Sequence, residues 1–226
     1  MRNDANFDKL GRRMSAPAIL LRPDQLSTRD LYQLLTRCVS PRPIAFVSTI
    51  SADGTPNLAP FSYFALGGLQ PPSVVFCPVN DRAGVEKDTL CNIREVGEYV
   101  IHGVTRDIAD RMNLTSATYP RGVNEFTETG FTAVPSELVR PPRVKEAHLA
   151  MECRSIEILT VGSGPYAGNF IIGEVLAIHI DPSIVDEHGL PDPLRLEVVG
   201  RMGGDLYVDA RPETLFEMKR PPAHPR

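Results

Sequence analysis

Two neighbouring runs decide the fold: RPIAFVSTI at residues 42–50 and NLAPFSYF at residues 57–64, joined by SADGT at residues 51–55. The first run is rich in β-branched and aromatic residues, which favour strands. Gly54 can take the positive φ that a tight turn requires. The second run ends in small, polar and aromatic residues rather than in plain core residues. The two runs therefore predict an antiparallel hairpin whose second strand can lie along a flat aromatic ligand.

The remaining helices and strands are expected to be short. The expected strands are Ser73–Cys77, Glu98–Val104, Met151–Val161, Phe170–Ile180 and Val198–Tyr207, and the expected helices are Thr28–Arg37, Asp88–Glu95 and Asp107–Met112. Residues 115–143 hold four prolines and are expected to be irregular; an irregular segment this long is usually functional or packs on a partner. Many short strands joined by turns favour a mainly β fold, an antiparallel barrel, over a doubly wound parallel sheet.

The composition is that of an ordinary globular domain. The chain has 226 residues, 42% hydrophobic and 23% charged, which is enough to bury a core without disulfides. We expect one domain at residues 26–210, an N-terminal arm at 1–25 and a C-terminal tail at 211–226. The net charge of −4 argues against sequence-independent nucleic-acid binding, and no apolar run is long enough for a membrane span. Four cysteines without a CxxC pair indicate reduced thiols and a cytoplasmic location.

Several motifs that carry chemistry in other proteins have the wrong context here. Gly162, Gly164 and Gly168 precede a strand, whereas a dinucleotide-binding turn opens a helix. Ser163 lacks the G-x-S-x-G spacing of a hydrolase nucleophile. The five histidines are scattered without metal-ligand spacing, so no metal site is expected. No acid–base pair stands out, as is usual where a cofactor carries the chemistry and the protein supplies binding and orientation.

The tripeptide Lys87-Asp88-Thr89 begins an expected helix. Free N–H groups and the positive end of the helix dipole favour an anion at this place. Lys87 adds a positive charge and Thr89 adds a hydroxyl donor. Taken alone, the tripeptide is better explained by Asp88 as an ordinary helix cap and Lys87 as a solvated charge. Beside the hairpin, it becomes a candidate phosphate site.

At this point the chain resembles the flavin reductase-like family of FMN-binding split barrels, in its longer flavoredoxin-like branch. Six motifs carry the resemblance, and they occur in family order over about residues 42–207. They are Arg42–Thr49, Pro56–Phe64, Lys87–Thr89, Met112–Ser116 (MNLTS), Ile172–Val175 (IGEV) and Gly200–Gly204 (GRMGG). The resemblance implies a homodimer of antiparallel split β-barrels with FMN at the subunit interface, FAD being possible.

The resemblance also implies which residues hold the flavin. The segment 59–63 would run along the ring, Lys87 to Thr89 would contact the phosphate, Ser48 and Thr49 would lie near the phosphate and ribitol, and residues 112–116 would lie near the ring or across the dimer interface. The implied cofactor-binding residues are Arg42, Pro43, Ser48, Thr49, Ala59, Pro60, Phe61, Ser62, Tyr63, Lys87, Asp88, Thr89, Asn113 and Thr115. No side chain is assigned a catalytic role.

One position departs from the family pattern. Many short-chain flavin reductases carry a histidine just before the G-E-V strand, where it helps to form the nicotinamide side of the pocket, whereas this chain has Asn169. The segment 115–143 is expected to cover the flavin instead. The first hypothesis is an NADH- or NADPH-dependent flavin reductase that passes hydride to flavin N5 and serves a small-molecule electron acceptor or a partner monooxygenase. The alternatives are a flavin-binding electron carrier reduced by a partner protein and a barrel that has lost its cofactor.

Overall fold

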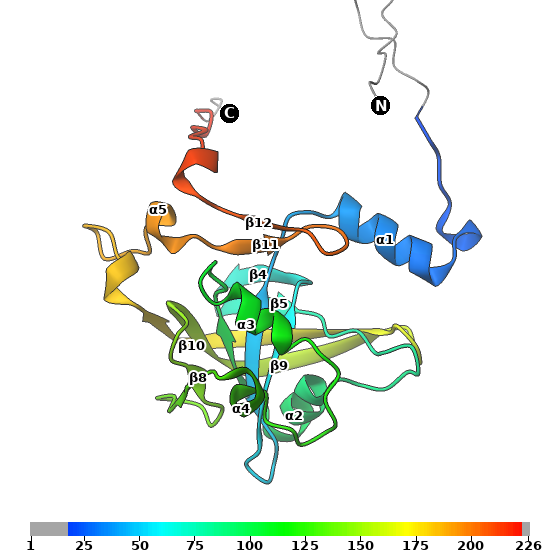
Figure 1. The fold of residues 1–226 in the computed structure, drawn as a ribbon, viewed down its shortest axis with the longest axis horizontal. Helices are drawn as coiled ribbons and strands as arrows, with labels where there is room; N and C mark the ends of the chain where they lie inside the picture. Colours follow the sequence, from blue (N-terminus) through cyan, green and yellow to red (C-terminus); the bar gives the residue numbers. More distant parts are fainter. Residues whose placement is uncertain (1–17, 223–226) are drawn as a thin grey trace, which may run out of the picture.

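A seven-stranded antiparallel sheet forms the body of the protein in this computed structural model, which describes residues 18–222 (Figure 1). Its strand order is β3-β2-β6-β9-β10-β5-β4. These strands are β2 (Ala45–Ile50), β3 (Pro56–Phe61), β4 (Phe64–Leu69), β5 (Pro72–Phe76), β6 (Glu98–His102), β9 (Leu149–Val161) and β10 (Gly168–Ile180). The expected mainly β, antiparallel fold is therefore confirmed. Residues 1–17 of the expected arm and residues 223–226 of the expected tail lie outside the described residues, and the expected division into arm, domain and tail stays a prediction.

The barrel is split between its two outer strands. β3 pairs only with β2, and β4 pairs only with β5. The chain crosses from one edge to the other through Ser62 and Tyr63, so β3 ends at Phe61 rather than at the expected Phe64. The Tyr63 carbonyl accepts a hydrogen bond from the Cys77 N–H (2.8 Å), which joins this crossing to the β5 side. The split therefore places two residues of the decisive second run at an opening in the sheet.

Two groups of buried side chains fill the two sides of the sheet. Along β2, Ala45 and Val47 pack with Phe76, Tyr99 and the inner face of α2 (Asp88–Val96), whereas Phe46 packs on the opposite side against α3 (Ala109–Leu114) and α4 (Glu125–Thr129). Strand β2 is thus buried on both faces, which explains why its sequence does not alternate between polar and apolar residues.

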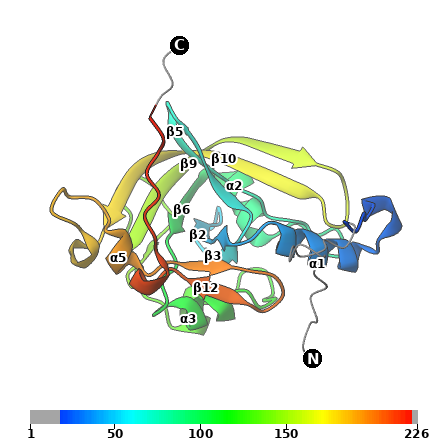
Figure 2. The same cartoon turned by 90° about the horizontal axis from the view of Figure 1, so that it is seen from above.

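A second, three-stranded sheet stands apart from the barrel, with order β1-β11-β12. Its strands are β1 (Arg42–Pro43), β11 (Val199–Arg201) and β12 (Tyr207–Asp209). The expectation that residues 198–207 form a strand that closes the core was wrong, because the chain turns at residues 202–206 and pairs back on itself and on β1. Figures 1 and 2 show this ribbon beside α1 (Thr28–Cys38), on the side of the barrel away from β9 and β10.

The guanidinium of Arg42 joins this ribbon, α1 and the split. It donates to the carbonyls of Thr36 and Val39 (2.7 Å to Val39) at the end of α1. It also donates to the Met202 carbonyl (2.9 Å) in the ribbon turn and to Ser62 Oγ (3.3 Å) at the split. Arg42 is buried, so these acceptors replace water around its charge.

The segment 115–143 is more ordered than the sequence predicted. It contains α4 and β7 (Ala133–Val134), and β7 pairs with β8 (Arg143–Val144). The fully buried carboxylate of Glu152 on β9 accepts the N–H groups of Glu137 and Leu138 (2.8 and 2.6 Å). Backbone N–H groups of this segment therefore donate to a side chain of the barrel rather than to a neighbouring strand. Residue patterns within the segment cannot predict such contacts.

The fully buried His102 fixes the end of the same segment. Its Nε2 accepts the Val144 N–H (2.9 Å), so its Nδ1 carries the proton and donates to the Phe46 carbonyl (2.8 Å). This arrangement holds the imidazole neutral, and burial lowers its pKa to about 4. Helix α5 (Pro193–Leu196) lies in the sequence between β10 and β11. In the described part of the chain, no helix has the length and apolar character needed to cross a membrane.

The neutral His102 predicts a loss of stability in mild acid. Its pKa is about 4 in the folded protein and about 6.5 in the unfolded chain, so protons favour the unfolded state between these values. This contribution to the free energy of unfolding is complete above pH ~6.5 and falls by up to about 3 kcal/mol as pH drops toward 4. His102→Gln keeps a donor and an acceptor but cannot titrate, and should flatten the curve of melting temperature against pH. The exposed His188 provides the control: His188→Gln should follow the wild type, and a steep curve for His102→Gln would contradict the prediction.

Gly173 in β10 is predicted to tolerate no side chain. A Cβ built there would overlap the Tyr99 hydroxyl, which is buried and has no hydrogen-bond partner in the described structure. Gly173→Ala should lower the free energy of unfolding by about 1–3 kcal/mol, as overpacking does in cores. Tyr99→Phe removes the hydroxyl and should restore part of this loss in the double variant. Gly68→Ala on β4, where a Cβ makes ordinary contacts, is the control; a neutral Gly173→Ala would refute the clash.

Candidate functional site

A hollow of about 390 Å³ runs along the outer edge of β3 and ends at the beginning of α2. Its volume falls in the range of roughly 300–1,000 Å³ usual for ligand sites. One wall is β3, the opposite wall is residues 115–119 with Arg121, and the floor at one end is the first turn of α2. Segments far apart in the sequence therefore form one elongated site.

The α2 end of the hollow is suited to an anion. Lys87 is the N-cap residue of α2, has an extended backbone and makes no side-chain cap hydrogen bond. The N–H groups of Leu90 and Cys91 donate to the Lys87 carbonyl, which leaves those of Asp88 and Thr89 as the first-turn donors. The helix dipole adds partial positive charge at this place. These donors and the Lys87 ammonium are the groups that a phosphate requires.

A buried polar cluster fixes the position of this helix start against β3. Asn57 Nδ2 donates to Thr89 Oγ1 (3.0 Å) and to Thr49 Oγ1 (3.2 Å). Asn92 Nδ2 donates to the same Thr49 oxygen (3.0 Å). All four side chains are buried, so breaking one bond would leave unsatisfied polar groups in the interior. The cluster thus sets the distance between the α2 N-terminus and the strand edge.

The outer edge of β3 presents alternating backbone groups to the hollow. The Leu58 N–H points away from β2, because it donates to Glu125 Oε2 (2.9 Å). Successive residues of an edge strand alternate in direction, so Pro60 also faces outward, where its missing N–H costs no ladder bond. Ser62 continues the outward series beyond the end of β3. The donors available to a flat ring at this end are therefore at the split, at Ser62 and Tyr63, rather than at Phe61.

Three of the four acidic side chains that line the hollow, all except Asp88, have partners within the fold or are buried. The carboxylate of Asp81 accepts the N–H groups of Ala83 and Val85 (2.8 Å each). Glu86 pairs with Arg94 (3.2 Å). Glu125 is buried, and this burial raises the pKa of its carboxyl. The hollow can thus accept an anion although it has several carboxyl groups in its wall.

The structure brings together nine of the expected cofactor-binding residues. Those that line the hollow are Ala59, Pro60, Phe61, Lys87, Asp88, Thr89 and Thr115, with Ser62 following at the open end. Tyr63 continues the same turn and is 38% exposed, so it is available to a ring at the split. The backbone edge and the helix start, which the sequence placed in one site, therefore meet in space.

The other expected residues lie elsewhere. Ser48 and Thr49 are fully buried; Ser48 Oγ donates to the Pro142 carbonyl, and Thr49 acts only through Asn57 and Asn92. Their expected contact with the phosphate and ribitol does not fit this interior position, because β2 is covered on both faces.

Two further groups of expected residues also sit outside the hollow. Arg42 is a buried link between elements, and Pro43 lines a separate apolar recess near β11. Asn113 lies near Tyr207, whose hydroxyl is 3.4 Å from its Oδ1. Their expected flavin contacts stay a prediction that would need a second subunit or a rearrangement.

Asn169 makes only structural contacts. Its Nδ2 donates to the Pro78 carbonyl (3.2 Å) and to Asn80 Oδ1 (2.9 Å), and its Oδ1 accepts the Thr160 hydroxyl (2.9 Å). The side chain is 1% exposed. It ties the loop before α2 to the β9–β10 turn, so in this chain the position offers nothing to a nicotinamide.

Sequence reasoning missed two charged residues of the site, Glu125 and Arg121. Both belong to the segment 115–143, of which only residues 115–119, Arg121 and Glu125 line the hollow. Most of that segment therefore packs on the barrel rather than over the hollow. The sequence signal was the Asn124 cap followed by Glu125, which marks a helix start; the cap is formed by Asn124 Oδ1 and the Phe126 N–H (3.1 Å).

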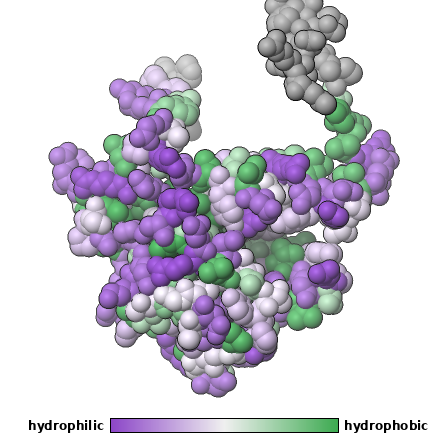
Figure 3. Space-filling model, in the orientation of Figure 1, coloured by the Kyte–Doolittle hydropathy of each residue, from purple (hydrophilic) through white to green (hydrophobic). Residues whose placement is uncertain are grey.

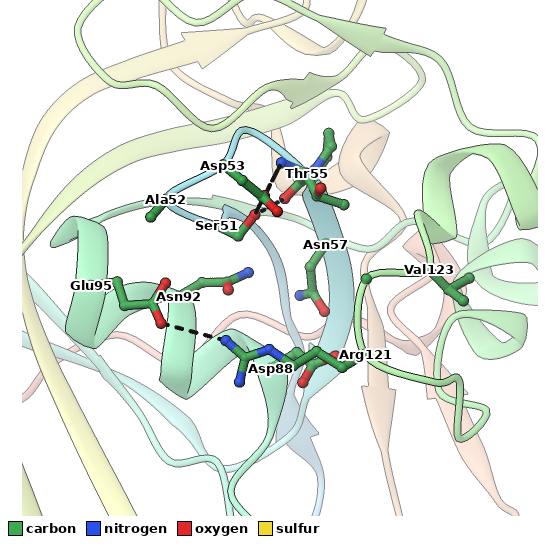
Figure 4. A pocket seen from close by; sticks show the side chains of 12 residues that line it. Ser51, Ala52, Asp53, Thr55, Asn57, Asp88, Asn92, Glu95, Arg121 and Val123 are labelled. Atoms are coloured by element: carbon green, nitrogen blue, oxygen red, sulfur yellow. Dashed lines mark hydrogen bonds and ion pairs between the residues drawn. The ribbon is translucent and has the colours of Figure 1, made fainter.

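A second hollow, of about 350 Å³, continues the first one beyond the start of α2 (Figure 4). It is lined by the β2–β3 turn, by Asn92 and Glu95 of α2, and by residues 121–123. Asn57, Asp88 and Arg121 line both hollows. In Figure 4 the Arg121 side chain extends past Asp88 toward Glu95, to which its Nη2 is paired at 3.4 Å. Arg121 thus stands where the two hollows meet.

Comparison with known proteins agrees with the fold. Residues 36–194 match the family described as Flavin reductase like domain. The crystal structure of nitrilotriacetate monooxygenase component B from Bacillus cereus is 30% identical with a TM-score of 0.82, and the match covers 91% of this chain and 100% of that one. The 2-nitrobenzoate 2-nitroreductase of Pseudomonas fluorescens is 28% identical with a TM-score of 0.81, covering 92% and 99%.

A flavin reductase with a split barrel domain from Shewanella frigidimarina is 25% identical with a TM-score of 0.74, covering 89% of this chain and 96% of that one. The match to the family extends over most of the chain and includes β2, β3 and α2, the elements that build the hollow. This protein belongs to the flavin reductase-like family of split-barrel flavoproteins.

Proposed function

We propose that this protein is an FMN-binding oxidoreductase that takes electrons from NADH or NADPH, with the flavin lying along β3. The observation that carries the proposal is the elongated hollow whose one end holds Lys87 and the α2 N-terminus and whose other end opens at Ser62 and Tyr63. Such a hollow fits a ligand with a phosphate at one end and a flat ring at the other. FMN would supply the redox chemistry, accepting hydride from the nicotinamide.

The residues of this chain would bind and orient the cofactor. Lys87, Thr89 and the first-turn N–H groups of α2 would hold the phosphate. Ala59 and Pro60 would line the ribityl chain, and the N–H groups of Ser62 and Tyr63 would donate to the ring edge, where they favour negative charge on the ring. At Tyr63 the flavin ring would stay accessible, so that the nicotinamide ring could stack on it. The proximity of the two rings would accelerate hydride transfer.

The ring end also supports a homodimer. Strand β4 borders the split as a free edge, and its Leu66 and Leu69 are 79% and 90% exposed. The face in Figure 3 carries further apolar areas, among them the stretch that leads into α1, with Ile19 and Leu20. Exposed apolar surface beside the unpaired edge of a strand is typical of a protein interface. We propose that a second copy of the chain covers this edge and completes the ring end of the site.

Two neighbours support the choice of electron acceptor. One is named a component B of a monooxygenase and the other a nitroreductase. We propose that reduced flavin serves either a partner monooxygenase or a small molecule that accepts electrons at the open ring end. A cytoplasmic location stays a prediction.

The buried position of Asn169 supports a second candidate, an FMN-binding electron carrier reduced by a partner protein. The family histidine that this residue replaces would contribute to the nicotinamide side of the pocket, and Asn169 cannot do so here because its amide is engaged within the fold. In this case the flavin would be reduced by a protein partner at the same open end.

The visible absorbance of the purified protein decides between the two candidates. We expect a flavin band, from copurified or added FMN, that bleaches when NADH or NADPH is added without oxygen. A bound flavin that bleaches with dithionite but with neither nicotinamide would support the electron carrier and overturn the reductase. Failure of FMN to bind would overturn both.

Lys87→Ala is predicted to weaken FMN binding by on the order of 1–3 kcal/mol, because it removes a charge-assisted contact with the phosphate. Riboflavin, which lacks the phosphate, should bind wild type and variant equally, and both constants can be measured by quenching of flavin fluorescence. The control is Lys145→Ala, since Lys145 is exposed and does not line the hollow. An unchanged FMN constant in Lys87→Ala would exclude Lys87 from the site.

A further inference from the structure

Arg121 is a cation at the phosphate end of the hollow that no motif of the sequence indicated. Its side chain lines the first hollow beside Lys87, Asp88 and Thr89, and it lines the second hollow as well. The backbone at this point is held on both sides. The Val123 N–H donates to the Pro120 carbonyl (3.2 Å) in a turn whose third residue, Gly122, has φ +86°, and such a turn favours glycine there.

The partner of Arg121 does not bind it firmly. The Arg121–Glu95 pair has a single contact of 3.4 Å, and the two side chains are 59% and 44% exposed. Exposed ion pairs of this kind contribute little to stability. The turn positions the Arg121 backbone, and the guanidinium can exchange Glu95 for a stronger anion at small cost.

Arg121 lies near the Asn57 end of β3, where the phosphate end of the proposed flavin would lie. The first hollow runs from Phe61 to Asn57, and the second continues from Asn57 to Ser51. With the ring at the split and the phosphate at α2, anything attached beyond the phosphate would have to pass Arg121. It would then enter a hollow lined by the carboxyl groups of Asp53, Asp88 and Glu95 (Figure 4).

We propose that Arg121 is the second cation of the flavin phosphate site and selects the monophosphate FMN over the dinucleotide FAD. The inference rests on the proposed flavin site. A terminal phosphate carries about −1.5 to −2 charges near neutral pH, and Arg121 adds a second positive charge to that of Lys87 at an end of the hollow that also holds the carboxyl group of Asp88. FAD has no terminal phosphate, and its second phosphate and adenosine would meet Arg121 and then the carboxyl groups of Asp53 and Glu95, which line the second hollow but not the first and repel a phosphate.

Glu95 competes with the ligand for the guanidinium. When FMN binds, Arg121 releases Glu95 and turns to the phosphate, where the helix start and Lys87 already concentrate positive charge. Removing the Glu95 charge should therefore strengthen FMN binding, whereas removing Arg121 should weaken it. Changes of opposite sign at the two residues are not expected if their pair only stabilises the fold.

The test compares dissociation constants of FMN, riboflavin and FAD for wild type, Arg121→Ala, Glu95→Gln and a control. Arg121→Ala should weaken FMN binding about tenfold, the loss of one charge-assisted contact, leave riboflavin unchanged and lower the preference for FMN over FAD. Glu95→Gln should tighten FMN binding and leave riboflavin unchanged. Arg106→Ala is the matched control, because Arg106 is 53% exposed, pairs with Asp110 and lies away from the hollow.

The outcomes separate this inference from the proposed function. Wild type that binds neither FMN nor riboflavin would refute the flavin site itself. Wild type that binds FMN, together with Arg121→Ala that binds it equally well, would overturn the role of Arg121 and leave the flavin site standing. If Arg121→Ala weakened FMN and riboflavin binding equally, the effect would be structural and the proposed phosphate contact would be overturned. If it weakened FMN and FAD binding equally, the proposed selectivity would be overturned. If Glu95→Gln bound FMN more weakly than wild type, the proposed competition between Glu95 and the phosphate would be overturned.

Discussion

The buried guanidinium of Arg42 is the interaction on which the relation between barrel, ribbon and site depends. Among the described residues its hydrogen-bond acceptors are three backbone carbonyls and the Ser62 hydroxyl, and its Cζ lies 6.0 Å from the centre of the Tyr63 ring. Each carbonyl belongs to a place where regular structure stops, at the end of α1 or in the ribbon turn. A buried cation without these acceptors would be very unfavourable, so the three segments must come together around it. The split of the barrel, where Ser62 lies, is thereby held in a defined shape.

The sequence predicted local elements well because their causes are local. The hairpin of β2 and β3 and that of β9 and β10 follow from strand residues flanking turn residues, and both are confirmed. The start of α2 at Asp88 and its glycine end at Gly97, with φ +77°, are also set by neighbouring residues. What local patterns could not predict is where two edges fail to pair. The sequence predicted β3 as an ordinary strand and did not predict β4, and only the register of the whole sheet makes these two strands the borders of a split.

The same distinction explains the outcome for the site. Ala59 to Phe61 and Lys87 to Thr89 meet because each belongs to a single strand edge or helix start. The family resemblance placed Ser48 and Thr49 near the phosphate and ribitol. Strand β2 is instead covered on both sides, and these hydroxyls satisfy backbone and amide groups inside. Glu125 and Arg121 reach the hollow only through the path of a long segment, whose fixation by His102 and Glu152 depends on residues far away in sequence.

The two ends of the hollow differ in how firmly they are fixed, and this difference matters for the function of a protein that binds a redox cofactor. The α2 end is built from buried, mutually bonded side chains, so a ligand group held there has a fixed position. The split end has free backbone donors, an exposed aromatic ring and an unpaired edge, so it can admit different partners in turn. A redox cofactor needs this combination, because it must stay in place while donor and acceptor exchange at its reactive ring. In the proposed dimer, the surface that covers the β4 edge would thus shape the ring end, and the choice of electron donor and acceptor would depend on the subunit interface more than on the residues that hold the phosphate.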